Sequence, residues 1–120
     1  MAQADIWYAI AIIFFIVTDY VTGVVKAIMQ STLSSSKMRE GLGHKFAYLV
    51  LALVAYFIDT INSHISIGLP VSVFICTVSG ICLIELTSII ENIAAINPEL
   101  ENTPFMNIFE QNSTPKHRKE

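Results

Sequence analysis

The sequence predicts an all-α membrane protein with three transmembrane helices, a basic first loop and a polar C-terminal tail. Of its 120 residues, 53% are hydrophobic and 14% are charged, whereas soluble globular proteins carry about 25% charged residues. The mean hydropathy is +0.59, and no Asp, Glu, Lys or Arg occurs from Thr60 to Ile84. A soluble domain of this size has too little interior to bury so much apolar surface. We therefore favour a membrane protein over a soluble helical bundle.

The first predicted helix spans about residues 6–29 and carries a polar face within an apolar segment. Asp19, Gly23 and Lys26 are spaced i, i+4 and i+7, which places them on one side of a helix. An ionised group deep in a membrane costs about 2.5–3.5 kcal/mol on insertion scales, so this face is expected to meet protein or water rather than lipid. Pairing with another helix or with a neighbouring subunit would compensate Asp19, and protonation is the alternative.

A polar connector is predicted from Gln30 to Lys45, where the chain is rich in serine and contains two glycines. This segment carries three basic residues and one acidic residue, a balance typical of a cytoplasmic loop that contacts anionic headgroups. The second helix is predicted at about residues 46–62. Asp59 lies near its end, so we expect this carboxylate to be exposed to water among the lipid headgroups.

The third helix is predicted at about residues 69–91, with Pro70 in its first turn, where the missing N–H is no loss. Small residues repeat every four positions along it and would allow close packing of a second helix. This small-residue ridge consists of Ser72, Cys76 and Gly80. Glu85 lies toward the exit side of the helix and is expected to reach water.

The predicted organisation is a transmembrane domain at residues 1–97 and a polar cytoplasmic tail at residues 98–120, because Asn97-Pro98 is expected to end helical order. The N-terminus and the connector at residues 63–68 carry no Lys or Arg, whereas the first loop and the tail each carry three. The positive-inside rule therefore predicts an N-terminus outside and a C-terminus in the cytoplasm.

No pattern of residues indicates an enzyme. The sequence has no phosphate-binding glycine loop, no CxxC and no HExxH, so we expect no catalytic residues, no cofactor and no metal site. The three histidines are scattered over separate connectors and the tail; they are His44, His64 and His117. The net charge of −3 gives no reason to propose a nucleic-acid partner.

A set of polar and glycine residues in the first helix and first loop resembles the phage lysis and toxin-secretion holins. An Asp, a Thr-Gly pair and a Lys in the helix are followed by Ser-Ser-Lys and then by a Gly and a Lys. The positions that match are Asp19, Gly23, Lys26, Ser36, Lys37, Gly41 and Lys45. The resemblance covers roughly residues 6–90.

This resemblance implies a non-enzymatic protein of the bacterial cytoplasmic membrane that forms homo-oligomers and large non-selective lesions. Its functional partner would be a peptidoglycan hydrolase or an exported toxin, without direct contact. Single molecules would pair their polar sides within one bundle, and intermolecular pairing would dominate at high density. A small oligomeric ion channel or transporter, with Asp19 or Glu85 as coupling carboxylate, and an antiholin-like regulator are the alternatives.

The candidate functional residues fall into two groups. The candidates for oligomerisation or for the pore face are Asp19, Gly23, Lys26, Ser72, Cys76 and Gly80. The family-motif loop consists of Ser36, Lys37, Gly41 and Lys45.

Overall fold

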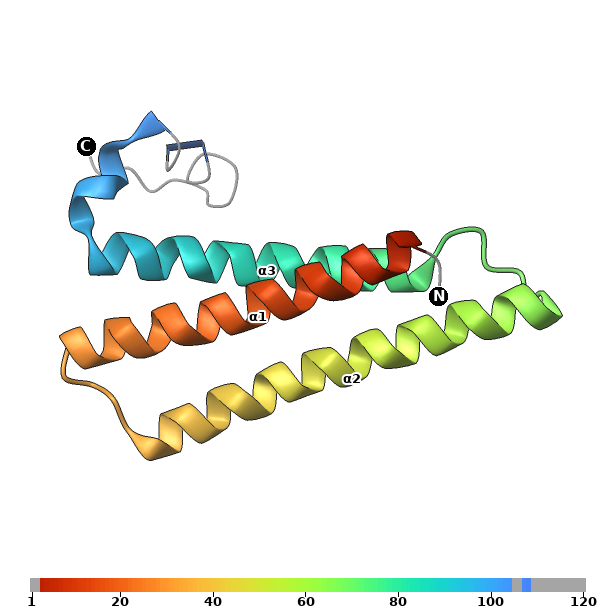
Figure 1. Ribbon diagram of the computed structural model, residues 1–120, viewed down its shortest axis with the longest axis horizontal. Helices are drawn as coiled ribbons and strands as arrows, with labels where there is room; N and C mark the ends of the chain where they lie inside the picture. The colour runs from red at the N-terminus through yellow and green to blue at the C-terminus, as the bar shows by residue number, and fades with distance from the viewer. Residues whose placement is uncertain (1–2, 105–106, 109–120) are drawn as a thin grey trace.

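The computed structural model describes residues 3–104, 107 and 108, and it consists of three long helices followed by one short helix (Figure 1). The elements are α1 (Gln3–Met29), α2 (Ser35–Ile65), α3 (Val73–Ile96) and the 3₁₀ helix η1 (Pro98–Asn102). Each of the three long helices is long and apolar enough to cross a membrane. The predicted all-α membrane fold is therefore confirmed.

The three helices pack around a small apolar core, and α1 and α3 form its larger part. Phe74 of α3 lies at one end of this core, where its ring meets Tyr8 of α1 and Tyr56 of α2 edge to face at centroid distances of 6.3 and 5.3 Å. The buried core residues are Ile12, Ile16, Ala52, Ala55, Phe74, Val78 and Ile81. Toward the connection between α1 and α2, α2 diverges from α3 (Figure 1). We call this the α1–α2 end of the bundle.

The second helix begins at Ser35, so the prediction of a connector up to Lys45 and a helix start near residue 46 is wrong. Ser34 is the N-cap, and its hydroxyl oxygen accepts the N–H of Lys37 at 3.1 Å, which starts a helix within the serine-rich segment. At about 1.5 Å per residue, the 31 residues of α2 span about 46 Å. Because the hydrocarbon layer is about 30 Å thick, polar turns of α2 extend beyond it.

The third helix also differs from its prediction, because it begins at Val73 and leaves Pro70 in the preceding connector. The carboxylate of Asp59, at the end of α2, accepts the N–H groups of Val73 at 2.8 Å and Phe74 at 3.0 Å and the hydroxyl of Ser72. Asp59 is therefore half-buried and caps α3 rather than facing headgroup water. The α-helix ends at Ile96, before the predicted Asn97-Pro98 break, and η1 follows it.

The outer surface of the bundle is apolar. Phe14 on α1, Leu53 on α2 and Leu83 on α3 are 60%, 70% and 65% exposed. Monomeric soluble proteins rarely expose so much contiguous apolar surface, whereas lipid tails cover it without cost. Residues 105–106 and 109–120 of the predicted tail lie outside the described residues.

Candidate functional site

An ionic network of one ammonium and two carboxylates joins the three helices inside the bundle. Lys45 of α2 places its Nζ 2.7 Å from Asp19 Oδ2 of α1 and 2.9 Å from Glu85 Oε2 of α3. The expected pairing of Asp19 with another helix is therefore confirmed. We refer to Asp19, Lys45 and Glu85 as the ionic network.

An amide and a hydroxyl extend this network along the contact between α1 and α3. Asn92 Nδ2 donates to Asp19 Oδ1 and to Thr22 Oγ1, both at 3.0 Å. Thr22 in turn donates its proton to the backbone carbonyl of Thr18, one turn earlier, at 2.8 Å. Every buried side-chain N or O atom of the described residues has a hydrogen-bond partner, so the polar interior is satisfied within a single chain.

The ionic network lies within the three helices that are long and apolar enough to cross a membrane. Each of its members is about 15 Å along its helix from the terminus at the α1–α2 end, at 1.5 Å per residue. Glu85 is 2% exposed and Asp19 is 8% exposed, so the prediction that Glu85 reaches water is wrong. The reason is the helix packing, which turns the Glu85 face of α3 toward Lys45 instead of toward an interface.

Because the ionic network is buried, its charges affect the stability of the bundle more than surface charges would. Two carboxylates face one ammonium, which leaves one excess negative charge inside the bundle when all three groups are ionised. A buried ion pair offsets its desolvation only if the geometry is good, and removal of one partner leaves a costly uncompensated charge. Movement of Lys45 away from the two carboxylates would therefore leave uncompensated negative charge inside the bundle.

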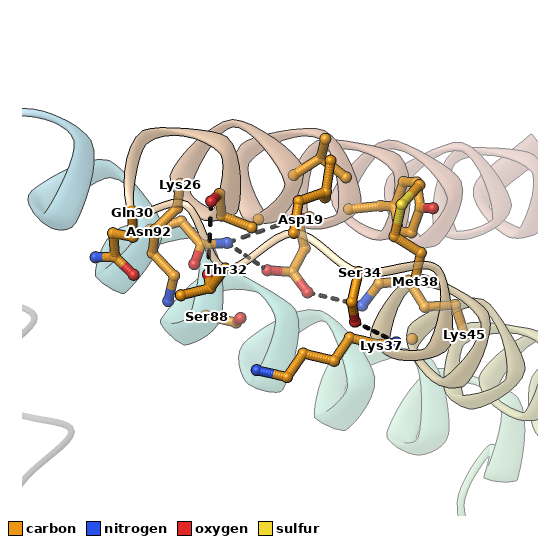
Figure 2. A pocket seen from close by; sticks show the side chains of 16 residues that line it. Asp19, Lys26, Gln30, Thr32, Ser34, Lys37, Met38, Lys45, Ser88 and Asn92 are labelled. Carbon is orange, nitrogen blue, oxygen red and sulfur yellow. Dashed lines mark hydrogen bonds and ion pairs between the residues drawn. The ribbon is translucent and has the colours of Figure 1, made fainter.

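A pocket of about 470 Å³ leads from the α1–α2 end to Asp19 and Lys45 (Figure 2). Its wall is formed by the last turns of α1, by residues 30–34, by the first turns of α2 and by two residues of α3, Ser88 and Asn92. Gly23 also lines it, and a Cβ atom at Gly23 would lie 3.6 Å from Asn92 Nδ2. The absence of a larger side chain at this position lets α3 approach α1 closely.

A comparison with protein-family models identifies the chain. The model described as the bacteriophage holin family matches residues 3–104, which include all three helices and the ionic network. The chain belongs to the bacteriophage holin family. No curated protein and no solved structure matches it. Membership implies that the protein acts by forming membrane lesions for lysis, and holins do so without enzymatic chemistry.

The family-motif residues of this holin lie on α2 rather than in a loop. Ser36 and Lys37 are exposed in its first turn, and Gly41 lies one turn further toward the membrane. Lys37, Gly41 and Lys45 line the pocket, so they share one side of α2. Of the candidates on α1, Asp19 is in the ionic network, whereas Gly23 and Lys26 line the pocket beside it.

The small-residue ridge of the holin faces away from its own core. Ser72 is used as the N-cap of α3, with its oxygen accepting the N–H of Ile75 at 3.0 Å. Cys76 and Gly80 are exposed, and no atom lies within 4 Å of a Cβ atom built at Gly80. The ridge is thus separate from the ionic network, and only a second molecule or lipid can contact most of it.

Three partners in the polar interior were not identified from the sequence. These are Lys45 as the cation for Asp19, and Glu85 and Asn92 as further members on α3. A signal existed for the last two, because Glu85, Ser88 and Asn92 share one helical face. Among residues 3–104, 107 and 108, no group of three or more His, Cys, Asp or Glu side chains could hold a metal ion.

Proposed function

We propose that this holin accumulates in the bacterial cytoplasmic membrane as closed bundles, and that many copies then assemble into a large non-selective lesion. A peptidoglycan hydrolase would cross this lesion without binding to it. The N-terminus would lie outside and the C-terminus in the cytoplasm, as the distribution of basic residues favours. The single observation that carries the mechanism is the ionic network, which hides the polar groups of all three helices inside each molecule.

The weak packing of α2 supports its role as the element that moves. The buried residues of α2 are two alanines, Ala52 and Ala55, whereas α3 buries six residues. Alanine offers little surface for the van der Waals packing that holds membrane helices together. At the α1–α2 end, where α2 diverges from α3, Lys45 supplies the ionic contacts of α2 to both other helices.

The opposite end of the bundle supports a pivot. There α2 is joined to α3 by the three hydrogen bonds to the Asp59 carboxylate and by the contact between Tyr56 and Phe74. Rotation of α2 about this end would separate Lys45 from Asp19 and Glu85. The three charged groups would then face water in a lumen, where their separation costs far less than in lipid.

Crowding would supply the driving force for this rotation. Each closed bundle has a lipid-covered outer surface and a small-residue ridge on α3, which allows close approach of a second helix. At high density, contacts between copies would replace the contacts that α2 makes within its own bundle. The polar faces of many copies would then line one continuous water-filled lesion.

Induced expression in a bacterium tests this function. Release of a large cytoplasmic reporter enzyme is followed for the holin alone, for a cytoplasmic peptidoglycan hydrolase alone and for both together. Abrupt release and lysis that require both proteins are expected. Ion leakage without passage of the hydrolase would instead indicate a channel, and an intact membrane would indicate an antiholin-like regulator.

Variants of α1 connect this test to the ionic network. Asp19→Leu removes one carboxylate and is expected to shift or abolish the time of release. Val21→Leu is the matched control, because Val21 is two residues away and its side chain is 52% exposed. Equal timing for wild type and Asp19→Leu at equal expression would contradict the role given to the network.

A further inference from the structure

The pocket at the α1–α2 end carries positive charge that the ionic network does not use. Lys26 of α1 and Lys37 of α2 both line it, and neither forms an ion pair with another described residue. Asp19 is the one acidic side chain among the lining residues, and its carboxylate is already held by Lys45 and Asn92. Lys26 and Lys37 outweigh the one excess negative charge of the ionic network, so the region of the pocket carries net positive charge.

We propose that this pocket binds the phosphate of an anionic phospholipid headgroup. Two ammonium groups on separate helices present up to six N–H donors to an anion. Gln30 and Ser34 also line the pocket and carry amide or hydroxyl donors suited to phosphate oxygens (Figure 2). Thr32 lines it too, but its hydroxyl donates to the carbonyl of Ala27 at 3.5 Å. The Ser34 oxygen accepts the N–H of Lys37, which leaves its own proton to donate.

The position of the pocket favours a lipid over free phosphate. It opens at the ends of α1 and α2, where a span of about 30 Å of hydrocarbon gives way to headgroups. Leu33 lines the pocket and is 45% exposed, and Ile28 and Met29 at the end of α1 are 57% and 59% exposed. These apolar side chains can contact the acyl chains of a lipid whose headgroup is in the charged pocket. A free anion has no acyl chains and needs no apolar surface beside its site.

The acidic residues near this end do not oppose the assignment. The exposed acidic residues near this end are Glu40 on α2, Glu91 on α3, and Glu99 and Glu101 on η1, and none of them lines the pocket. The proposal requires only that the chain sits in a bilayer. The proposal is independent of lesion formation. Absence of lipid binding would leave the proposed function intact, and absence of lesion formation would leave the lipid site intact.

Native mass spectrometry of the full chain in neutral detergent tests the site. Phosphatidylglycerol or phosphatidylcholine is added at low mole fraction, so that no charged surface forms. Phosphatidylglycerol is expected to bind at least tenfold more tightly than phosphatidylcholine. The double variant K26Q/K37Q is expected to lose on the order of tenfold in phosphatidylglycerol affinity, because a charged donor binds a phosphate oxygen more strongly than a neutral amide does.

Two control variants make the result specific. Arg39→Gln removes a basic charge from an exposed position on α2 that does not line the pocket, and it should bind phosphatidylglycerol like wild type. K26R/K37R keeps both charges and should retain most of the affinity. A change in the size-exclusion elution of K26Q/K37Q would indicate that the double variant is misfolded. In that case the affinity of the single variant Lys37→Gln for phosphatidylglycerol tests the site, because Lys37 is exposed and its replacement does not disturb the core.

Three results would overturn the proposal. The first is equal binding of the two phospholipids by wild type. The second is a loss for Arg39→Gln as large as that for K26Q/K37Q, which would indicate diffuse charge attraction. The third is displacement of phosphatidylglycerol by inorganic phosphate at equal concentration, which would indicate a site for free anions.

Discussion

Replacement of Lys45 by Gln removes the cation that faces both buried carboxylates. In the described part of the chain, no other basic side chain forms an ion pair with Asp19 or Glu85. Two buried carboxylates would then share the bundle interior without a counter-charge. Removing one partner of a buried ion pair typically costs about 3–5 kcal/mol, and Lys45→Gln is expected to destabilise the closed bundle by about this amount.

Glu85→Gln changes the same network in the opposite sense. It removes the excess negative charge but keeps an oxygen acceptor for Lys45, whose 2.7 Å contact with Asp19 remains. We expect a stability within about 1 kcal/mol of wild type or above it, since neutral replacement of buried charge is often neutral or stabilising. The double variant K45Q/E85Q should recover part of the loss caused by Lys45→Gln, because one buried carboxylate is then eliminated.

These stabilities can be measured by SDS titration of the full chain in mixed micelles. The reporter is the rate at which the thiol of Cys82 reacts with a maleimide, because Cys82 packs against the core. Cys76 is replaced by Ser to remove the exposed thiol. A Lys45→Gln variant as stable as wild type, or equal losses for Lys45→Gln and Glu85→Gln, would refute the electrostatic reasoning.

Further expectations concern helix contact, helix capping and orientation. Gly23→Ala should be tolerated because its Cβ would lie 3.6 Å from Asn92 Nδ2, whereas Gly23→Leu should cost about 1–3 kcal/mol by overpacking, in the same SDS titration. Asp59→Ala should cost about 1–3 kcal/mol by removing the acceptor of two backbone N–H groups, and Asp59→Asn should cost less; equal losses would contradict the capping role. Reporter enzymes fused to each terminus should be active outside the membrane at the N-terminus and in the cytoplasm at the C-terminus, and the opposite pattern would reject the proposed orientation.

The helices themselves were predictable because their apolar segments are long, but their polar turns were not. The segment from Ser35 to Lys45 looks like a loop when only hydropathy is considered, since it is rich in serine and contains two glycines. The N-cap at Ser34 starts a helix there instead, and the part beyond the hydrocarbon needs no apolar side chains. Helix ends outside a bilayer therefore depend on capping rather than on hydropathy.

The polar face of Asp19 was predictable, but the identity of its partners was not. Spacing along one helix shows that Asp19 lies on the same side as Gly23. It does not show how far α2 and α3 are shifted along their axes relative to α1. Because that shift decides which polar residues lie at one depth, Lys45 and Glu85 could be assigned only from the three-dimensional structure.

Labelling of the inner face of α2 in living cells tests most directly whether the closed bundle opens to water. Ala52 is 6% exposed, and its neighbour Leu53 on the outer surface of the bundle is 70% exposed. Ala52→Cys and Leu53→Cys are placed in a background in which Cys76 and Cys82 are replaced by Ser, and a membrane-impermeant maleimide is added before and after lesion formation. The proposed mechanism predicts protection of both thiols before, and labelling of Ala52→Cys alone after. Protection of Ala52→Cys while a large cytoplasmic enzyme leaves the cell would contradict it.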